Sequence, residues 1–370
     1  MNAKTIDLFS GAGGFTEGLR KAGYSTLLAN DFDEMACKTF THNHPNVPSI
    51  CRDIAKLPVE EILERTGLSN GELDLVVGGP PCQGFSLAGR RMVDDPRNKM
   101  FLEFVRVVNG LKPKAFVFEN VSGILTMQKG EVVRAIVAAF ERIGYSCEYR
   151  VLNSADYGVP QKRLRFILVG SRDGKQIGFP RPSHFSSTCQ GTLFQENLPT
   201  HVTSWDALSD LPYIEQGQGE ELLTHSGDYH NAYQEERRGS RIPGTIFNHR
   251  ATSHSERIIE RYAAIPEGGD NSQVPDHLRT KKINVYKIHS DFPARTVTCN
   301  HRTDLLHPKV PRGTTVREAA RLQSFDDDYQ FFGNLTRKAK WVTQDDQVGN
   351  AVPPLLARAL GQHIKEVMDW

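Results

Sequence analysis

The chain has 370 residues, 38% of them hydrophobic and 24% charged, with a formal net charge of +1. These values are typical of a globular protein long enough for two domains, and no apolar run reaches the roughly 18 residues of a membrane-spanning helix. There is no signal-peptide pattern, and the six cysteines form no Cys-x-x-Cys pair. We therefore expect a cytoplasmic protein that has no disulfide framework, binds no metal and does not associate with a membrane.

The first 171 residues alternate between strand and helix patterns. In chain order, strands are predicted over 5–9, 25–30, 73–77, 115–118 and 165–169, and helices are predicted from about Thr16 and over 100–111 and 131–143. Strands that alternate with helices predict an α/β fold with a largely parallel, doubly wound sheet covered on both faces.

The pattern changes after Gly170. Residues 181–292 show little periodicity and much Gly, Pro, Ser and Thr, which predicts a smaller, irregular domain. Their scattered aromatic residues are too many for a free linker. Helical spacing returns over 315–324 and 354–368. We therefore predict one domain formed by residues 1–180 and 293–370, and a second formed by 181–292.

Charge is unevenly distributed in the second half of the chain. Residues 181–236 contain one Lys or Arg against nine Asp or Glu, whereas residues 237–312 contain fourteen against seven. The basic segment is a candidate surface for binding a polyanion, although a charged segment is more often an ordinary solvent-exposed face.

A glycine-rich turn, Phe9-Ser10-Gly11-Ala12-Gly13-Gly14-Phe15, follows the first predicted strand. Such turns bring backbone N–H groups and a helix N-terminus close to a ligand. Asp31, at the end of the next predicted strand, is placed to accept hydrogen bonds from ribose hydroxyls. Because Thr16 replaces the last glycine of the dinucleotide fingerprint, an NAD-dependent oxidoreductase and a methyltransferase both fit this turn.

A second turn, Gly-Gly-Pro-Pro-Cys-Gln-Gly-Phe-Ser over 78–86, follows the predicted strand 73–77. Its glycines let the backbone turn sharply and its prolines stiffen it. A cysteine buried as a small hydrophobe needs no such brace. We therefore predict that Cys82 is a nucleophile, which the oxidoreductase alternative does not explain.

Six segments, in order along the chain, resemble the motifs of the DNA (cytosine-5)-methyltransferase family. They are 7–14, 80–86, 119–121 (Glu-Asn-Val), 161–165 (Gln-Lys-Arg-Leu-Arg), 317–323 and 347–354. The resemblance runs from residue 5 to about residue 361. It implies a Rossmann-like methyltransferase domain that transfers a methyl group from S-adenosylmethionine to C5 of cytosine in a specific duplex DNA sequence. A transfer-RNA methyltransferase of the same fold is the alternative, and an inactive DNA-binding relative is disfavoured.

The resemblance assigns four catalytic residues. Cys82 adds to C6 of the base, which makes an enamine whose C5 can attack a methyl group. Glu119 contacts N3 and the exocyclic amine, and in its protonated form supplies general-acid assistance. Arg163 and Arg165 pack beside the base, which has to be flipped out of the duplex. A structural role, in which they pair with Glu119 or the backbone, is compatible with this placement. The loop 83–99 is expected to close over the flipped nucleotide.

The resemblance also implies a cofactor pocket. Phe15 and Phe32 are expected to sandwich the adenine, and Asp53 to accept a hydrogen bond from its amino group. The implied pocket residues are Phe9, Ser10, Gly11, Gly13, Phe15, Asp31, Phe32, Asp53, Ile54, Pro80, Leu102, Asn350 and Val352.

Target recognition is expected to fall to residues 181–292, with the acidic part facing away from DNA. The predicted groove or backbone readers are Arg237, Arg238, Arg241, Asn248, His249 and Arg250, since Arg and Asn suit guanine and adenine edges. The expected partners are duplex DNA and, in a restriction-modification system, a separately acting restriction endonuclease. A monomer is the expected state.

Overall fold

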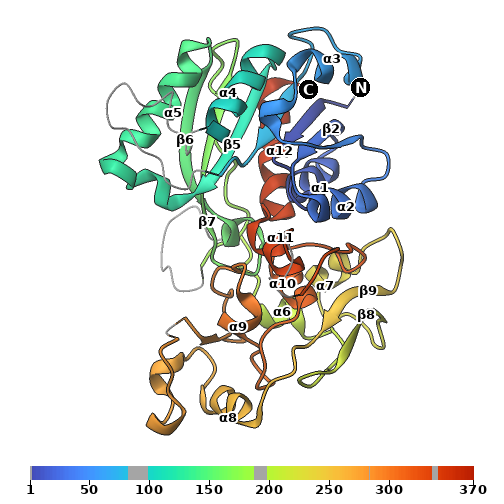
Figure 1. Ribbon diagram of the computed structural model, residues 1–370, viewed down its shortest axis with the longest axis vertical. Coiled ribbons are helices and arrows are strands. Elements are labelled where there is room, and N and C mark those ends of the chain that lie inside the picture. Colours follow the sequence, from blue (N-terminus) through green and yellow to red (C-terminus); the bar gives the residue numbers. More distant parts are fainter. Residues whose placement is uncertain (1, 82–98, 187–197, 283, 336–340) are drawn as a thin grey trace. The chain divides into compact units, whose positions relative to one another are not determined.

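The computed structural model describes residues 2–81, 99–186, 198–282, 284–335 and 341–370 (Figure 1). It divides into two compact units. Unit 1 consists of Met1–Asn153, Leu164–Arg181 and Ala357–Trp370, and unit 2 of Ser154–Arg163 and Pro182–Leu356. Residues 293–356, which the sequence predicts in the first domain, thus pack with unit 2. The functions predicted for the two domains stay predictions.

Unit 1 contains a seven-stranded sheet in the order β3-β2-β1-β4-β5-β7-β6. Strands β1 to β5 are parallel to one another, whereas β7 is antiparallel to both β5 and β6. The strands are β1 (Lys4–Leu8), β2 (Ser25–Asp31), β3 (Ser49–Cys51), β4 (Leu75–Gly78), β5 (Ala115–Val121), β6 (Ser146–Asn153) and β7 (Leu164–Ser171).

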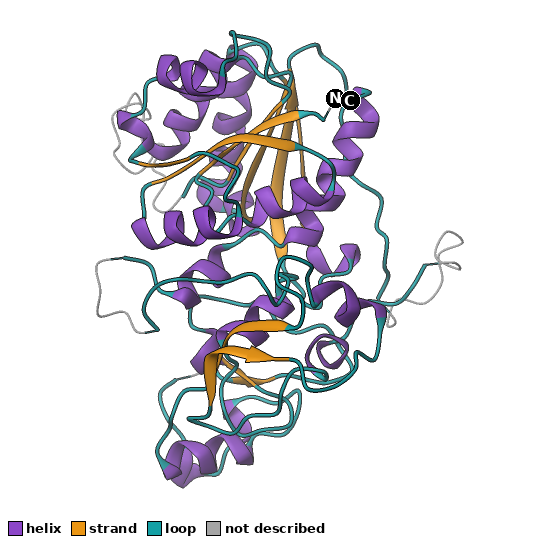
Figure 2. Cartoon of the chain, turned by 90° about the vertical axis from the view of Figure 1, so that its right-hand side faces the viewer, coloured by secondary structure: helices purple, strands orange, loops and turns teal. Residues whose placement is uncertain are grey.

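Helices cover both faces of this sheet (Figure 2). They are α1 (Gly14–Lys21), α2 (Glu34–Asn43), α3 (Val59–Thr66), α4 (Lys99–Leu111), α5 (Glu131–Arg142) and most of α12 (Pro354–Met368). The doubly wound α/β prediction is therefore confirmed. The sequence did not predict β3, β6, α2 or α3.

Aromatic packing forms much of the unit 1 core. Phe104 of α4 packs edge-on against Phe116 and Phe118 of β5, and Phe140 of α5 stacks on Phe116 with ring centroids 4.1 Å apart. Gly170 of β7 makes room for this cluster, because a Cβ there would lie 2.1 Å from the Phe116 ring. Such edge-to-face contacts add to the stabilisation from apolar burial.

A buried carboxyl holds the start of α1 in place. The N-cap residue Gly13 has no side chain, and Asp7 of β1 accepts hydrogen bonds from the Thr16 N–H at 3.2 Å and its Oγ1 at 2.7 Å instead. Burial raises the pKa of Asp7 to about 7. This contact fixes the turn between β1 and α1, where the sequence predicts a ligand.

Unit 2 is built from short elements joined by long irregular segments. Strands β8 and β9 form an antiparallel pair, and β10 and β11 a parallel pair of two residues each. The elements are α6 (Ser204–Leu208), β8 (Gly219–Thr224), α7 (Ala232–Arg237), β9 (Thr245–Arg250), α8 (Glu256–Ala264), β10 (Tyr286–Lys287), α9 (His301–Asp304), β11 (Leu305–Leu306), α10 (Val316–Leu322) and α11 (Gln344–Asn350). Within the described ranges, no helix has both the length and the apolar character needed to cross a bilayer.

Candidate active site

The glycine-rich turn places backbone N–H groups beside an acidic side chain at the end of β2. Asp31 accepts hydrogen bonds from Gly11 N–H at 2.8 Å through Oδ2 and from Asp33 N–H at 3.0 Å through Oδ1. Phe9, Gly11 and Gly13 have φ angles of 55°, 52° and 92°. A Cβ on Gly11 would meet no atom within 4 Å, so open space lies beside the turn. Burial raises the pKa of Asp31.

Other predicted pocket residues of unit 1 differ in what they offer a ligand. The Ser10 hydroxyl is buried without a hydrogen-bond partner among the described residues, and Asp53 uses Oδ1 to accept from Ala55 N–H at 3.0 Å. Phe32 is 65% exposed, whereas Phe15 is only 5% exposed, so Phe32 has the more open ring. Ile54 is buried, and Leu102 packs against the core.

A second group of side chains in unit 1 lies at the ends of β4, β5 and β7. Arg165 Nε contacts Glu119 Oε1 at 2.8 Å, and both side chains are 11% exposed. A Cβ on Gly79 would lie 2.9 Å from Glu119 Oε2. Gly79 is therefore small for a specific reason: its missing side chain lets the carboxyl approach the turn that leads to Cys82.

Asn120 ties this turn to β5. Its Nδ2 donates to the Pro80 carbonyl at 2.9 Å, and Pro80 is buried. Cys82 itself and most of the predicted lid, residues 83–98, lie outside the described residues. The structure thus places Glu119, Arg165, Asn120 and Pro80 together. Pro80 stands two residues before the predicted nucleophile in the sequence.

Arg163 has a different environment from Arg165. It is fully buried in unit 2 and donates to the carbonyls of Val297 at 2.9 Å, Gly349 at 2.8 Å and Ala351 at 3.0 Å. These contacts join Arg163 to the segments that carry Val297 and 349–351. They are compatible with a place beside the base, so that role of Arg163 stays a prediction.

The two predicted pocket residues of the C-terminal part belong to unit 2. Asn350 is exposed at the end of α11, and its Oδ1 accepts from Cys299 Sγ at 3.2 Å. Val352 is 8% exposed. No group of three or more His, Cys, Asp or Glu side chains in the described ranges is arranged to hold a metal ion.

Most of the predicted DNA readers are structural. Arg237 is fully buried and donates to the Ser324 carbonyl, Arg238 pairs with Asp210, and Arg241 pairs with Asp328. Asn248 and His249 are likewise buried and hydrogen-bonded within unit 2. Only Arg250 of the six is exposed. The prediction is wrong for the buried Arg237, Asn248 and His249, because partners later in the chain hold these side chains within unit 2. It stays a prediction for the exposed Arg250.

Two exposed cations of unit 2, Lys162 and Arg295, lie on a pair of neighbouring segments. Lys162 N–H donates to the Ala294 carbonyl at 2.8 Å, and Thr296 Oγ1 donates to the Lys162 carbonyl at 2.7 Å. Gln161 and Ala294 form a parallel bridge, so Lys162 and Arg295 follow it side by side, and both are exposed. The Arg295 guanidinium lies 3.8 Å from the centroid of the Tyr286 ring.

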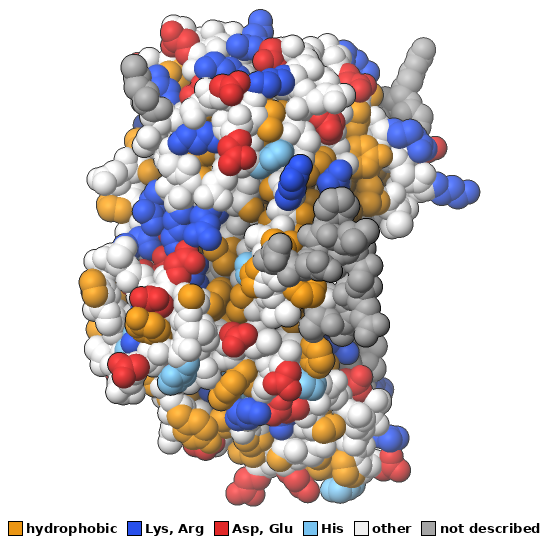
Figure 3. All heavy atoms as spheres, turned by 180° about the vertical axis from the view of Figure 1, so that it is seen from behind, with side chains coloured by type: hydrophobic (Ala, Val, Ile, Leu, Met, Phe, Trp, Pro, Cys, Tyr) orange, Lys and Arg blue, Asp and Glu red, His pale blue; other side chains and the backbone are white. Residues whose placement is uncertain are grey.

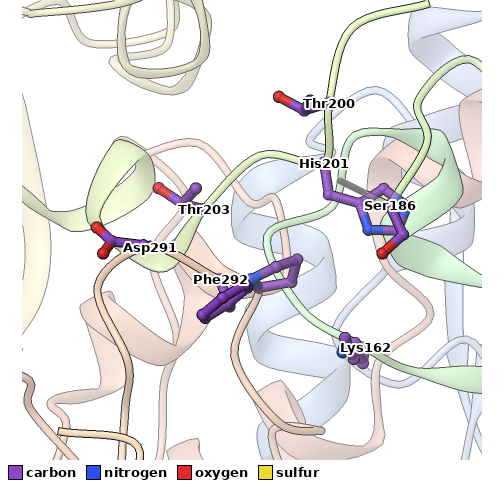
Figure 4. Close-up of a pocket in the computed structure, with 8 residues that line it drawn as sticks. Lys162, Ser186, Thr200, His201, Thr203, Asp291 and Phe292 are labelled. Atoms are coloured by element: carbon purple, nitrogen blue, oxygen red, sulfur yellow. The ribbon is translucent and has the colours of Figure 1, made fainter. Parts of the chain in front are cut away.

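Lys162 also lines a small pocket of about 80 Å³ (Figure 4). His201 contributes from the opposite segment and is held by Asp156 Oδ1, 2.9 Å from its Nε2. The lining residues are Lys162, Ser186, Thr200, His201, Thr203, Asp291, Phe292 and Pro293.

On one molecular face, Lys and Arg side chains occur both singly and gathered in a patch (Figure 3).

Comparison with known proteins finds the same resemblance over nearly the whole chain. Residues 3–366 match the family model described as C-5 cytosine-specific DNA methylase. The chain is 38% identical to the type II methyltransferase M1.HphI of Haemophilus parahaemolyticus, over 98% of this chain and 87% of the relative. It is also 38% identical to M.DdeI of Desulfomicrobium norvegicum, over 97% of this chain and 88% of the relative.

Solved structures resemble the fold along its full length. One, described as a DNA modification methyltransferase encoded within an E. coli prophage, has a TM-score of 0.77 and 27% identity, covering 100% of both chains. The S. pombe Dnmt2 methyltransferase has a TM-score of 0.59 at 15% identity, covering 100% of both chains, and shows likeness of fold alone.

Proposed function

The chain belongs to the C-5 cytosine-specific DNA methylase family. On this basis we propose which residues bind the cofactor, activate the base and contact DNA. The protein is a DNA (cytosine-5)-methyltransferase that transfers a methyl group to C5 of cytosine in DNA. The relatives' type II names support a place in a restriction-modification system, with a separately acting endonuclease. We also propose that the protein acts in the cytoplasm as a monomer.

The methyl donor is proposed to be S-adenosylmethionine. Two groups suit its polar atoms: Asp31, which Gly11 N–H holds in place as an acceptor for ribose, and the buried Ser10 hydroxyl, which has no hydrogen-bond partner among the described residues. Phe32 and Asp53 are proposed to hold the adenine. The remaining proposed contacts are Phe9, Gly13, Phe15, Ile54, Pro80, Leu102, Asn350 and Val352. When bound, the cofactor supplies an electrophilic methyl group on a sulfonium.

The chain's own residues are proposed to activate the cytosine ring. The Cys82 thiolate adds to C6, and the proton on Glu119 is shared with N3, which draws electron density away from C6. Arg165 orients Glu119 through Oε1, so Oε2 is left facing Gly79 and the turn to Cys82. This arrangement of Glu119 against the Gly79 backbone is the observation that supports the assignment best. C6 is hidden in a duplex, so the target base has to be flipped out.

DNA contacts are proposed for the exposed cations of unit 2. Lys162 and Arg295 suit phosphates because both are exposed, and Arg295 is held by the Tyr286 ring. The transfer-RNA alternative has no comparable support, since the type II relatives match almost the whole chain and the Dnmt2 likeness is one of fold.

The nucleophile is tested by trapping the covalent adduct on duplex DNA that contains 5-fluorocytosine, with S-adenosylmethionine present. The wild-type chain should form an adduct stable to denaturation, and Cys82→Ala should form none. Cys147→Ala is the matched control and should trap normally, because this half-buried cysteine lies on β6. An adduct that persists in Cys82→Ala would refute the assignment.

The role of Gly79 is tested separately. Gly79→Ala should lower kcat about 10²-fold or more, because the added Cβ displaces the Glu119 carboxyl from its working position. Gly123→Ala is the matched control, since a Cβ there meets no atom within 4 Å. Unchanged kcat in Gly79→Ala would contradict the proposed geometry.

A further inference from the structure

Two cysteines flank the segment proposed to hold the ribose and adenine of the cofactor. Cys37 lies in α2, and Cys51 ends β3, where it is the register partner of Asp31 in β2. Cys37 Sγ lies 3.6 Å from the Asp31 carbonyl, and Cys51 Sγ lies 3.9 Å from the Phe32 carbonyl. The two thiols therefore donate to the carbonyls of two adjacent residues, Asp31 and Phe32.

The two sulfurs thus lie against one short stretch of backbone, and neither is in a disulfide. They differ in access, since Cys51 is exposed and Cys37 is buried. Burial raises the pKa of the Cys37 thiol, as do Cys51 and the carboxylates of Asp31 and Asp33. Because Cys51 is the exposed thiol, a reagent from solvent meets it first, and the Cys37 thiol next to the same backbone segment then reacts with the product.

We propose that Cys37 and Cys51 are an oxidisable dithiol whose conversion to a disulfide lowers the affinity of the chain for S-adenosylmethionine. This inference rests on the proposed cofactor site at Asp31 and Phe32. A disulfide removes both S–H donors and draws the sulfurs to about 2.05 Å. The Asp31 and Phe32 carbonyls then lose their thiol contacts, and the segment between the glycine turn and α2 shifts.

The oxidant is a hydroperoxide, and the steps balance. The Cys51 thiolate attacks one peroxide oxygen, the O–O bond breaks, and the hydroxide released takes up a proton to become water. Cys37 sulfur then displaces the hydroxyl group from the Cys51 sulfenic acid, forming the S–S bond and releasing a second water with the thiol proton. The dithiol loses two electrons and hydrogen peroxide gains them.

The test uses the full chain carrying Cys82→Ala, so that the proposed nucleophile cannot be oxidised. Hydrogen peroxide treatment should yield a Cys37–Cys51 disulfide in peptide mass mapping. It should also weaken S-adenosylmethionine binding, measured by calorimetry, about tenfold or more, with recovery after dithiothreitol. Adding Cys51→Ser, or separately Cys37→Ala, should remove both the disulfide and the peroxide effect.

Two results would overturn the proposal: a mass map without the Cys37–Cys51 disulfide, or a mapped disulfide with unchanged cofactor affinity. Failure of the proposed cofactor site looks different. In that case the reduced chain would not bind S-adenosylmethionine, or Asp31→Ala would bind it as tightly as the parent.

Discussion

The two units of the molecule bury different kinds of side chain. The largest fully buried side chains of unit 1 are phenylalanines, such as Phe104, Phe116 and Phe140. In unit 2 the largest fully buried side chains are arginines: Arg163, Arg237, Arg312, Arg317 and Arg321. Unit 1 has an apolar core between sheet and helices, whereas unit 2 combines a smaller apolar cluster around Ile265 and Leu306 with an interior held by guanidinium groups.

Backbone structure explains this difference. In a sheet and its helices, backbone groups satisfy one another, so the space between them can be apolar. The long irregular segments of unit 2 leave carbonyls without such partners, and buried arginines supply the donors. Arg317 donates to the carbonyls of Phe247, Asp326 and Tyr329. Arginine suits this task because its five donors are fixed in one plane.

The strongest test of this difference between the units is to replace one buried side chain in each of them. Arg317→Met should destabilise unit 2 by about 3–5 kcal/mol, because an apolar chain of similar length leaves three carbonyls unsatisfied. Phe104→Leu should cost unit 1 less than about 2 kcal/mol, because its apolar contacts largely remain. Urea unfolding, monitored by hydrogen exchange at the amides of each unit, measures the change in the free energy of unfolding for both variants.

Arg134→Met serves as the control for the Arg317 variant. Arg134 lies on α5 and is exposed, so its substitution should change stability by under about 0.5 kcal/mol. If Arg317→Met were as stable as the wild type, the interior of unit 2 would not depend on guanidinium donors.

The units should also respond to pH in opposite directions. Burial raises the pKa of Asp7 in unit 1 to about 7 from its ordinary 3.8. Its contribution to stability is therefore present below about pH 4 and lost as pH rises through 7, a change on the order of 4 kcal/mol. Acidification from pH 7.5 to pH 4.5 should stabilise unit 1.

In unit 2 the same acidification should lower stability. Burial lowers the pKa of His307 to about 4, so its contribution is present above about 6.5 and lost as pH falls toward 4. Burial opposes ionisation of Glu318 and Asp327, but Arg312 and Arg321 hold the pKa of these carboxyls well below their usual range. Their contributions are lost only at still lower pH.

Hydrogen exchange at pH 7.5, 5.5 and 4.5, corrected for the intrinsic exchange rate, measures how the free energy of opening changes with pH in α1 and α10. Asp7→Asn should flatten the slope in unit 1 alone, since the amide keeps an oxygen for Thr16 and does not titrate. If the stability of both units changed in the same direction with pH, the predicted difference between them would be wrong.

The same contrast sets what the sequence could predict. Strands such as 115–118 and the helix 131–143 were read correctly because apolar periodicity reports a core of the unit 1 kind. The paired positions of Gly11 and Asp31 also followed, since consecutive parallel strands end at one edge of the sheet. Strand β3, with three residues, is too short to carry a periodic signal.

The roles of the arginines could not be read in this way. An arginine side chain has the same chemistry whether its partner is a phosphate, a carboxylate or a carbonyl, and only the folded chain identifies the partner. Arg237 and Arg241 were therefore assigned to DNA, although Ser324 and Asp328 hold them within unit 2. The tie between Glu119 and Gly79 was also missed, because it is a contact between two strand ends that no local pattern reveals.

Cations that are exposed rather than buried should carry the weaker, additive contribution to DNA binding. Lys162→Ala and Arg295→Ala should each weaken duplex binding about three- to tenfold on every sequence, and each should reduce the salt slope of log K by about 1. Arg241→Lys is the matched control, because Arg241 pairs with Asp328 inside unit 2 and keeps its charge in this variant. Fluorescence anisotropy with cognate and unrelated duplexes across a salt series measures the effect. A loss confined to one sequence would assign these residues to base reading instead, since a phosphate contact carries no sequence information.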